Sequence, residues 1–166
     1  MKIYTKRGDD MKTDVIGHRV YKDDTIIECL GTIDELSVSI MIAAHHLMDH
    51  QIKEDLLMLV RSLRDFSVAL LRIEEAVVTA DTVANIEKSI DYYQNKLSPL
   101  IDFVLPGETL AGSYLHLSRT IARRLERRLI THGRKVNINK YIIQYANRLS
   151  DLLFVIARYT EEKYAS

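Results

Sequence analysis

The chain contains one cysteine, two prolines and no tryptophan among its 166 residues. Its single thiol, Cys29, cannot form an internal disulfide and excludes a four-cysteine zinc site, so we expect a reducing compartment, the cytoplasm. Long apolar runs are also missing, because the longest, Leu152–Ala157, is far shorter than the roughly 20 residues that span a bilayer. The first ten residues lack the apolar core of a secretion signal. These absences predict a soluble protein with no membrane partner.

Neither sign of charge is in excess, since 23 Lys and Arg residues match 23 Asp and Glu residues. This balance argues against a surface that binds nucleic acid over its whole extent. Positive charge is nevertheless concentrated in one place, because residues 118–128 read SRTIARRLERR and hold five arginines in eleven positions. The sequence therefore directs the search for an anionic partner to this one segment.

Apolar residues recur at helical spacing in five stretches that follow a polar start. Residues 1–30 contain Gly8 and Gly17 and show no sustained helical period, which predicts an N-terminal loop with at most short strands. We expect five helices, at about Thr32–Met48 with Thr32 as N-cap, Ile52–Glu75, Asp81 to Pro99, Thr109–His132 and Asn139–Lys163. Short connections favour an all-α five-helix bundle in a single domain, 1–166, with segment 1–30 leading into a helical body at 31–166.

The fifth predicted helix is nearly all apolar between Leu149 and Ala157. An amphipathic helix on the surface of a bundle needs an apolar stripe on one side only. This stretch is therefore expected to be surrounded, either by other helices of the chain or by another subunit.

The arginine segment has a polar and an apolar face when its residues are placed at 100° per residue. The polar face combines His116, Arg119, Arg123, Glu126 and Arg127. The opposite face holds Tyr114, Leu115, Leu117, Ile121, Ala122, Leu125 and Leu129. Two interpretations stay open on this pattern alone. The polar face is either solvated, or a site for oligophosphate, whose oxygens match the fork of a guanidinium group two at a time.

Two other stretches place polar residues where helices are expected. Asp34 and Glu35, in GTIDELS, suit the start of a helix through its dipole alone. Asn147 and Asp151 lie four residues apart inside an apolar helix, and buried polar groups need hydrogen-bond partners. That partner is either another helix or a ligand.

Taken together, six segments resemble the motifs of the PduO-type ATP:cob(I)alamin adenosyltransferases. They read KIYTKRGDD, RVYKDD, GTIDELS, FVLPG, LHLSRTIARRLERR and NRLSDLLFVIARY, in the family's order and over nearly the whole chain. The resemblance implies a homotrimer of five-helix bundles with each active site between neighbouring subunits. It implies transfer of the 5′-deoxyadenosyl group of ATP to the cobalt of reduced cobalamin, with release of triphosphate and with Mg²⁺ as cofactor. It also implies a flavin-type reductase and a B12-dependent enzyme as partners.

The resemblance implies ATP-binding residues in two parts of the sequence, the N-terminal segment and the later helices. The N-terminal residues that match the family's ATP-binding segment, which is not a Walker loop, are Thr5, Lys6, Gly8, Asp9 and Lys22. Arg123 and Arg127 match arginines on the phosphate side, and Asn147 matches an asparagine that contacts the nucleotide. The expected ATP site thus combines the N-terminal segment with the arginine helix.

The resemblance also implies roles in catalysis and in corrinoid binding. Arg119 matches an arginine that the family pairs with the acidic residue of its DEL motif, here Asp34, and Glu126 matches a carboxylate that orients the arginines. With Arg123, these residues are the expected catalytic set. Phe103 matches an aromatic residue beneath the corrin that excludes the lower axial ligand and eases reduction of cobalt(II). No protein ligand for a metal is assigned.

Three positions depart from the family's pattern. Met11 and His18 stand where glycines are usual, and Glu108 replaces the second glycine of LPGG. The conformations of the ATP loop and of the corrin-side loop are the features that these substitutions affect.

Two classes of alternative are kept. A nucleic-acid-binding module would use the arginine face, although Asp34, Glu126 and Asp151 interrupt its positive charge. A non-catalytic nucleotide or corrinoid sensor could use the same scaffold. A ferritin-like metal bundle is excluded, because the chain contains no Glu-x-x-His motif.

Overall fold

The chain folds into five helices preceded by a small hairpin. The structure, a computed structural model, describes residues 2–71, 78–103 and 105–164. The strands are β1 (Lys12–Val15) and β2 (His18–Tyr21), and the helices are α1 (Thr25–His45), α2 (His50–Leu70), α3 (Ala80–Gln94), α4 (Leu110–Gly133) and α5 (Lys140–Tyr164). The all-α class and the number of helices expected from the sequence are confirmed.

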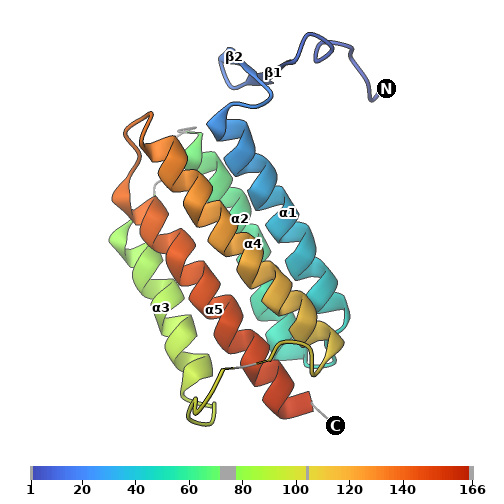
Figure 1. Ribbon diagram of the computed structural model, residues 1–166, viewed down its shortest axis with the longest axis vertical. Helices are drawn as coiled ribbons and strands as arrows, with labels where there is room; N and C mark the ends of the chain where they lie inside the picture. Colours follow the sequence, from blue (N-terminus) through green and yellow to red (C-terminus); the bar gives the residue numbers. More distant parts are fainter. Residues whose placement is uncertain (1, 72–77, 104, 165–166) are drawn as a thin grey trace.

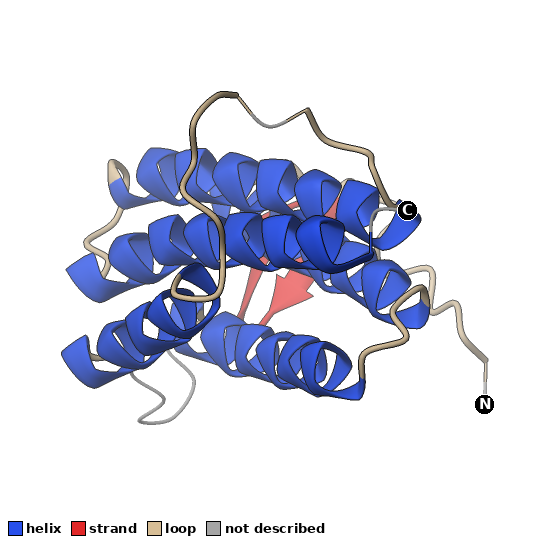
Figure 2. Ribbon diagram, turned by 90° about the horizontal axis from the view of Figure 1, so that it is seen from below, coloured by secondary structure: helices blue, strands red, loops and turns tan. Residues whose placement is uncertain are grey.

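Helix α4 is at the centre of the arrangement, between α1 and α5 (Figure 1). Helix α3 packs on α5, and α2 packs on α1. The hairpin projects from the end of the bundle where α1 begins, whereas the loop between α3 and α4 lies at the opposite end (Figure 1). Seen from below, where the helices run across the view, this loop passes in front of them (Figure 2). The N-terminal segment and the α3–α4 loop are therefore separated by the length of the bundle.

The hairpin joins two antiparallel strands through a two-residue turn. Val15 pairs with His18, and the turn places Gly17 at a φ of 80°. Lys6 and Met11 also have positive φ, 60° and 67°, a region that glycine enters most easily. Met11 thus occupies a backbone conformation that explains why a glycine is usual at its position.

Helix α1 begins seven residues earlier than the sequence predicted. The carboxylate of Asp24 caps the helix by accepting a hydrogen bond from the amide of Ile26 at 3.0 Å. The expected N-cap, Thr32, is instead fully buried inside the helix, so residues 25–30 are not part of a loop. Gly31, just before the expected start, lies on the outer face of the helix, where an added Cβ would meet nothing within 4 Å.

The other helix bounds differ less from expectation. Asp49 caps α2, with its carboxylate accepting from the amides of Gln51 and Ile52. The expected continuation of this helix through Glu75, including Ile73, lies partly outside the described residues. Helix α3 ends at Gln94, so the stretch before Pro99 belongs to the loop.

The apolar middle of α5 is buried within its own chain. Leu153 and Ala157 have no exposed surface, and Ile156 is 1% exposed. Helices α4 and α3 cover most of α5, with α2 contributing a smaller contact. Of the two explanations that the sequence left open, coverage by other helices therefore suffices, and this stretch gives no argument for a second subunit.

Candidate functional site

Two of the five arginines of α4 hold that helix to α1. Arg124 forms an ion pair with Glu35. Arg128 pairs with Glu28 at 2.8 Å and donates a hydrogen bond to the Thr32 hydroxyl. The position of Thr32 inside α1 makes the last contact possible. Arg124 and Arg128 thus have internal partners that account for their charge.

The charge of the other three arginines remains available for a ligand. They are Arg119, Arg123 and Arg127. Arg123 contacts Glu126 at 3.0 Å and keeps about half of its side chain exposed. Arg127 is exposed and forms no ion pair with any residue that the structure describes. The Nε atom of Arg119 is buried without a hydrogen-bond partner in the described chain, and its guanidinium lies 6.0 Å from the ring centroid of Phe154. A ligand rich in anionic oxygens would satisfy these groups.

Glu126 connects the arginine face to α5. Its Oε2 contacts Arg123 at 3.0 Å, and its Oε1 accepts a hydrogen bond from the Asn147 amide at 3.0 Å. The Asn147 oxygen in turn accepts from Arg148 at 2.8 Å, and Arg148 pairs with Glu87 of α3 at 2.8 Å. The structure thus brings together three residues of the expected site. The hydrogen-bond partner of Asn147 thus lies on another helix. The second hydrogen of its amide group remains able to contact a nucleotide.

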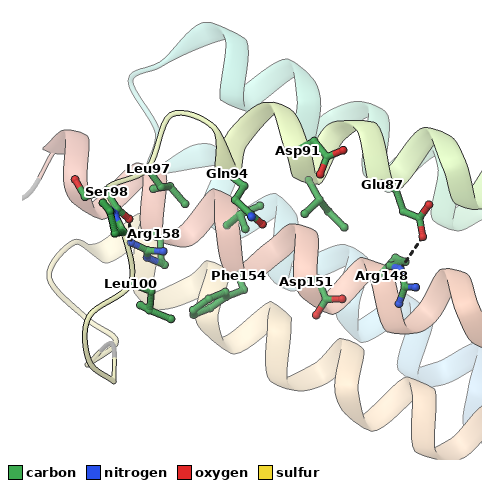
Figure 3. A pocket seen from close by; sticks show the side chains of 13 residues that line it. Glu87, Asp91, Gln94, Leu97, Ser98, Leu100, Arg148, Asp151, Phe154 and Arg158 are labelled. Carbon is green, nitrogen blue, oxygen red and sulfur yellow. Dashed lines mark hydrogen bonds and ion pairs between the residues drawn. The ribbon is translucent and has the colours of Figure 1, made fainter.

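A groove between α3 and α5 continues from this network (Figure 3). Its lining includes Glu87, Arg148, Asp151 and Phe154, which follow one another along the groove. Desolvation raises the pKa of Asp151, and the cationic groups of Arg148 and Arg123 offset part of this effect. The groove therefore has polar walls near Glu87 and Arg148, and the ring of Phe154 lies farther along it, before Arg158 at the opposite end.

The expected pair between Asp34 and Arg119 is not formed within one chain. Asp34 is exposed on α1, and no contact between its carboxylate and Arg119 occurs in the described structure. Both side chains remain able to bind a partner outside the chain.

The N-terminal residues expected to bind ATP form a tight turn. An added Cβ at Gly8 would lie 3.1 Å from the ammonium nitrogen of Lys22, so the lysine side chain passes directly over the glycine backbone. The amide of Asp9 donates to the carbonyl of Lys6 at 3.3 Å, and the hydroxyl of Thr5 accepts from the amide of Arg7 at 3.4 Å. The five predicted residues are thus gathered in one segment, at the end of the bundle where α1 begins.

The loop between α3 and α4 presents apolar side chains to solvent. Phe103 is 98% exposed, Ile101 is 95% exposed and Leu105 is 82% exposed. A cavity of about 570 Å³ lies beneath the loop, and its lining includes Phe103, Phe154, His116 and Arg119. Arg119 and the loop aromatic therefore line the same cavity. Glu108 lies at the outer edge of the same loop, beside Phe103.

Two residues of α4 lie differently from the helical-wheel prediction. His116, expected on the polar face, is 5% exposed, and its Nε2 lies 3.2 Å from a carboxylate oxygen of Glu161 on α5. Leu117, expected to pack inward, is 48% exposed. A buried carboxylate provides the polar partner that allows a histidine to be buried, and no local pattern indicates it because Glu161 is 45 residues away. Sequence reasoning also missed Phe154.

No helix in the described parts of the chain is long and apolar enough to cross a membrane. Within residues 2–71, 78–103 and 105–164, no three His, Cys, Asp or Glu side chains gather in a group that could hold a metal ion.

Comparison with known proteins identifies relatives that all carry the same kind of name. The family model for cobalamin adenosyltransferase matches residues 3–160. A corrinoid adenosyltransferase of Bacillus subtilis is 38% identical over 165 residues, covering 95% of this chain and 86% of that protein. The PduO corrinoid adenosyltransferase of Salmonella typhimurium is 35% identical over 95% of this chain, which spans about half of that relative's length (49%).

Solved structures agree with the sequence comparison. A PduO-type ATP:corrinoid adenosyltransferase variant from Lactobacillus reuteri, with histidine in place of a phenylalanine and complexed with cobalamin and ATP, superposes with a TM-score of 0.88. It is 31% identical and covers 97% of this chain and 91% of its own. A variant of the same enzyme with lysine in place of an arginine, complexed with ATP, superposes with a TM-score of 0.87. The chain described here belongs to the cobalamin adenosyltransferase family.

Proposed function

We propose that this chain transfers the 5′-deoxyadenosyl group of ATP to the cobalt of reduced cobalamin. The observation that carries the proposal is the cavity shared by Arg119 and Phe103, because it brings an arginine of α4 beside an apolar surface suited to a corrin ring. In the reaction, cobalt(I) attacks C5′ of ATP with its electron pair. The cobalt–carbon bond forms, the C5′–oxygen bond breaks, and triphosphate leaves with the bonding electrons.

The protein needs no nucleophile of its own for this reaction, so its part is alignment and charge stabilisation. Arg123 and Arg127 bind the departing triphosphate, whose negative charge increases as the C5′–oxygen bond breaks. Glu126 holds Arg123 by the 3.0 Å contact and is itself fixed by Asn147. Because this carboxylate is bonded on both oxygens, it orients the arginine rather than meeting the phosphate.

Phe103 is the proposed contact for the lower face of the corrin. A phenyl ring that is 98% exposed has no place in the core of its own chain, and a flat apolar macrocycle would cover it. By occupying the lower face, the ring keeps the axial ligand away from cobalt and so eases its reduction. A flavin-type reductase supplying that electron and a B12-dependent enzyme taking the product complete the proposal, in the cytoplasm.

The site is completed by a second copy of the chain, in a homotrimer. The N-terminal ATP residues and the Phe103 loop lie at opposite ends of a bundle whose central helix has 24 residues, about 36 Å at 1.5 Å per residue (Figure 1). Reacting atoms must approach within roughly 3.5 Å, so both segments of one chain cannot serve the same pair of substrates. A neighbouring copy supplies the N-terminal segment, and its Asp34 pairs with Arg119.

Magnesium is a separate question, because the described residues contain no group of three potential ligands. Mg²⁺ commonly binds through substrate phosphates with one or two carboxylates. We therefore assign it no protein site and derive no step from it; ATP would bring the ion on its phosphate oxygens.

The test is an anaerobic assay with ATP and chemically reduced cobalamin, in which the absorbance of adenosylcobalamin is followed. The proposal expects turnover that needs ATP and is unaffected by added RNA. ATP binding without turnover would favour a nucleotide or corrinoid sensor. RNA binding that ATP displaces would favour use of the arginine face for nucleic acid.

A further inference from the structure

Glu161, near the end of α5, is the one buried carboxylate among the described residues, with 3% of its surface exposed. Burying a carboxylate is costly unless hydrogen bonds or charges compensate it. The side chain must therefore have partners that repay its burial, and none of them is an arginine of α4.

Both oxygens of Glu161 are used. The Oε1 atom accepts a hydrogen bond from the backbone amide of Gly107 at 3.1 Å, and the Oε2 atom lies 3.2 Å from Nε2 of His116. Gly107 comes four residues after Phe103 and has a φ of 120°, a conformation that side chains other than glycine rarely adopt. The carboxylate thus fixes the end of the Phe103 loop at the point where the chain turns into α4.

The first turn of α4 leaves space for this carboxylate. A Cβ added at Gly112 would lie 2.5 Å from both Cγ and Oε1 of Glu161. No real side chain tolerates such contacts, so Gly112 and Glu161 fit only as a pair. A glycine inside a helix weakens that helix, and here the space it leaves lets Glu161 reach the loop.

The beginning of the loop is also held by α5. The amide of Ser98 donates to Glu162 at 3.1 Å, and the carbonyl of Ser98 accepts from Arg158 at 2.9 Å. Figure 3 shows Arg158 beside Ser98 at the end of the groove. The last turns of one helix therefore fix both ends of a loop whose middle is exposed.

His116 links this anchor to the cavity. Its ring lies edge-on to Phe154, with centroids 6.2 Å apart, and lines the cavity together with Phe103. Its Nδ1 atom is buried without a hydrogen-bond partner in the described structure. The contact to Glu161 is thus the hydrogen bond that fixes the orientation of the imidazole in the cavity wall.

We infer that Glu161 is a positioning residue for corrinoid binding. It holds the Phe103 loop through Gly107 and the cavity wall through His116, so that Phe103 is presented to the corrin in one place. The inference rests on the proposed function, in which Phe103 contacts the corrin. Glu161 touches neither substrate and acts only through these two residues.

Three variants test the inference. Glu161→Ala removes both contacts, and we expect the KM for cobalamin to rise at least about tenfold while the KM for ATP is unchanged. Glu161→Gln keeps an oxygen that can accept from Gly107, and we expect it to restore most of the affinity. Gly112→Ala combined with Glu161→Ala refills the vacated space, so stability should recover without recovery of the cobalamin KM.

The matched control is Asp49→Ala, which removes an ion pair of 2.7 Å with Lys163 at the same end of α5 but touches no part of the loop. It should lower stability and leave the cobalamin KM unchanged. If this control raised the cobalamin KM as Glu161→Ala does, or if the double variant restored it, Glu161 would merely be a packing residue.

Hydrogen exchange of the loop amides measures the anchor without any turnover. Exchange at residues 105–109 should become faster in Glu161→Ala and remain near wild type in Glu161→Gln. Unchanged exchange in Glu161→Ala would overturn the inference even if the enzyme were active. A wild-type protein that made no adenosylcobalamin would refute the proposed function instead, and faster exchange in Glu161→Ala would still establish the anchor.

Discussion

At the scale of single residues, the partners of each arginine separate structural charge from charge left for a ligand. Arg124 and Arg128 are paired with carboxylates of α1, whereas Arg127 has no such partner in the described chain. Arg123 is paired only with Glu126, which Asn147 also holds. Five arginines that look equivalent in the sequence therefore divide into two that pair with α1 and three that do not.

Replacing Arg123 by alanine should weaken ATP use without unfolding the bundle. A hydrogen bond to a charged group contributes about 1.5–3 kcal/mol, so kcat/KM for ATP should fall roughly 10- to 100-fold. The free energy of unfolding should change by no more than about 0.5 kcal/mol, because about half of the side chain is exposed. Steady-state kinetics and urea unfolding measure the two effects.

The control for this prediction is Arg128→Ala on the same helix. It removes a contact to Glu28 and should cost up to about 1 kcal/mol of stability with unchanged ATP constants. If wild type and Arg123→Ala had the same kcat/KM for ATP, Arg123 would be a solvated side chain without a part in ATP use.

Replacing Phe103 by alanine should selectively slow the route that starts from cobalt(II). Burying a phenyl ring contributes about 1.5–3 kcal/mol, so its loss should slow the rate of that route roughly 10- to 100-fold. Stability should not change, because the ring is 98% exposed in the free chain. Parallel assays from cobalt(II) with a weak reductant and from chemically generated cobalt(I) separate the steps. An equal decrease in both, or no decrease in either, would contradict the role given to Phe103.

Sequence periodicity placed most arginines correctly and failed at His116. A helical wheel assigns direction but carries no information about the neighbouring helix. The histidine is buried because Glu161 reaches it, and Glu161 fits because residue 112 is a glycine. Such a fit among three residues depends on tertiary packing, which no local pattern encodes.

At the scale of elements, apolar spacing predicted all five helices, and the errors concern helix ends. Helix α1 was expected to begin after Gly31, yet Ile26, Cys29 and Ile33 continue the buried stripe through that glycine. The glycine lies on the outer face, where it costs helix stability but interrupts no packing. The cap that starts the helix, Asp24, is one of two adjacent aspartates, and only the structure distinguishes them.

The end of α5 is tied to the start of α2 by charge, and this connection predicts a pH dependence. Hydrogen bonding from Lys163, followed by that from the Ile52 amide, lowers the pKa of Asp49 to about 2. A carboxylate with a lowered pKa stabilises the fold above its ordinary value near 4, and this contribution is lost as the pH falls from about 4 to about 2. Asp49→Asn should therefore lose less stability than wild type over that range.

Urea unfolding at pH 6, 4, 3 and 2.5 measures this difference. Asp81→Asn is the control, because it removes an exposed carboxylate that forms no ion pair in the described structure. A wild type and an Asp49→Asn variant with the same pH profile would show that the connection adds nothing to stability.

At the scale of the whole molecule, the proposed substrate-binding segments lie too far apart for one chain to complete a site. The apolar middle of α5, which the sequence suggested could contact another subunit, is already buried. The case for assembly comes instead from Asp34 and Arg119, which form no ion pair within the described structure, and from exposed apolar side chains on α1 and α4, such as Val38 and Leu117.

We predict a trimer in dilute solution, measured by light scattering.

Mixing two variants that are each inactive tests more sharply whether the site is shared between chains. Lys22→Ala and Arg123→Ala disable different parts of a site, so mixed trimers should contain some intact sites and regain part of the activity that each variant lacks. A stable monomer, or mixtures no more active than the separate variants, would contradict a site shared between chains.

The central claim is that carbon 5′ of ATP moves to cobalt while triphosphate leaves in one piece. ATP labelled at C5′ and incubated anaerobically with cobalt(I) cobalamin tests it directly. We expect one equivalent of label in adenosylcobalamin for each equivalent of intact triphosphate. Unlabelled cobalamin, or release of diphosphate and phosphate in place of triphosphate before transfer, would contradict it.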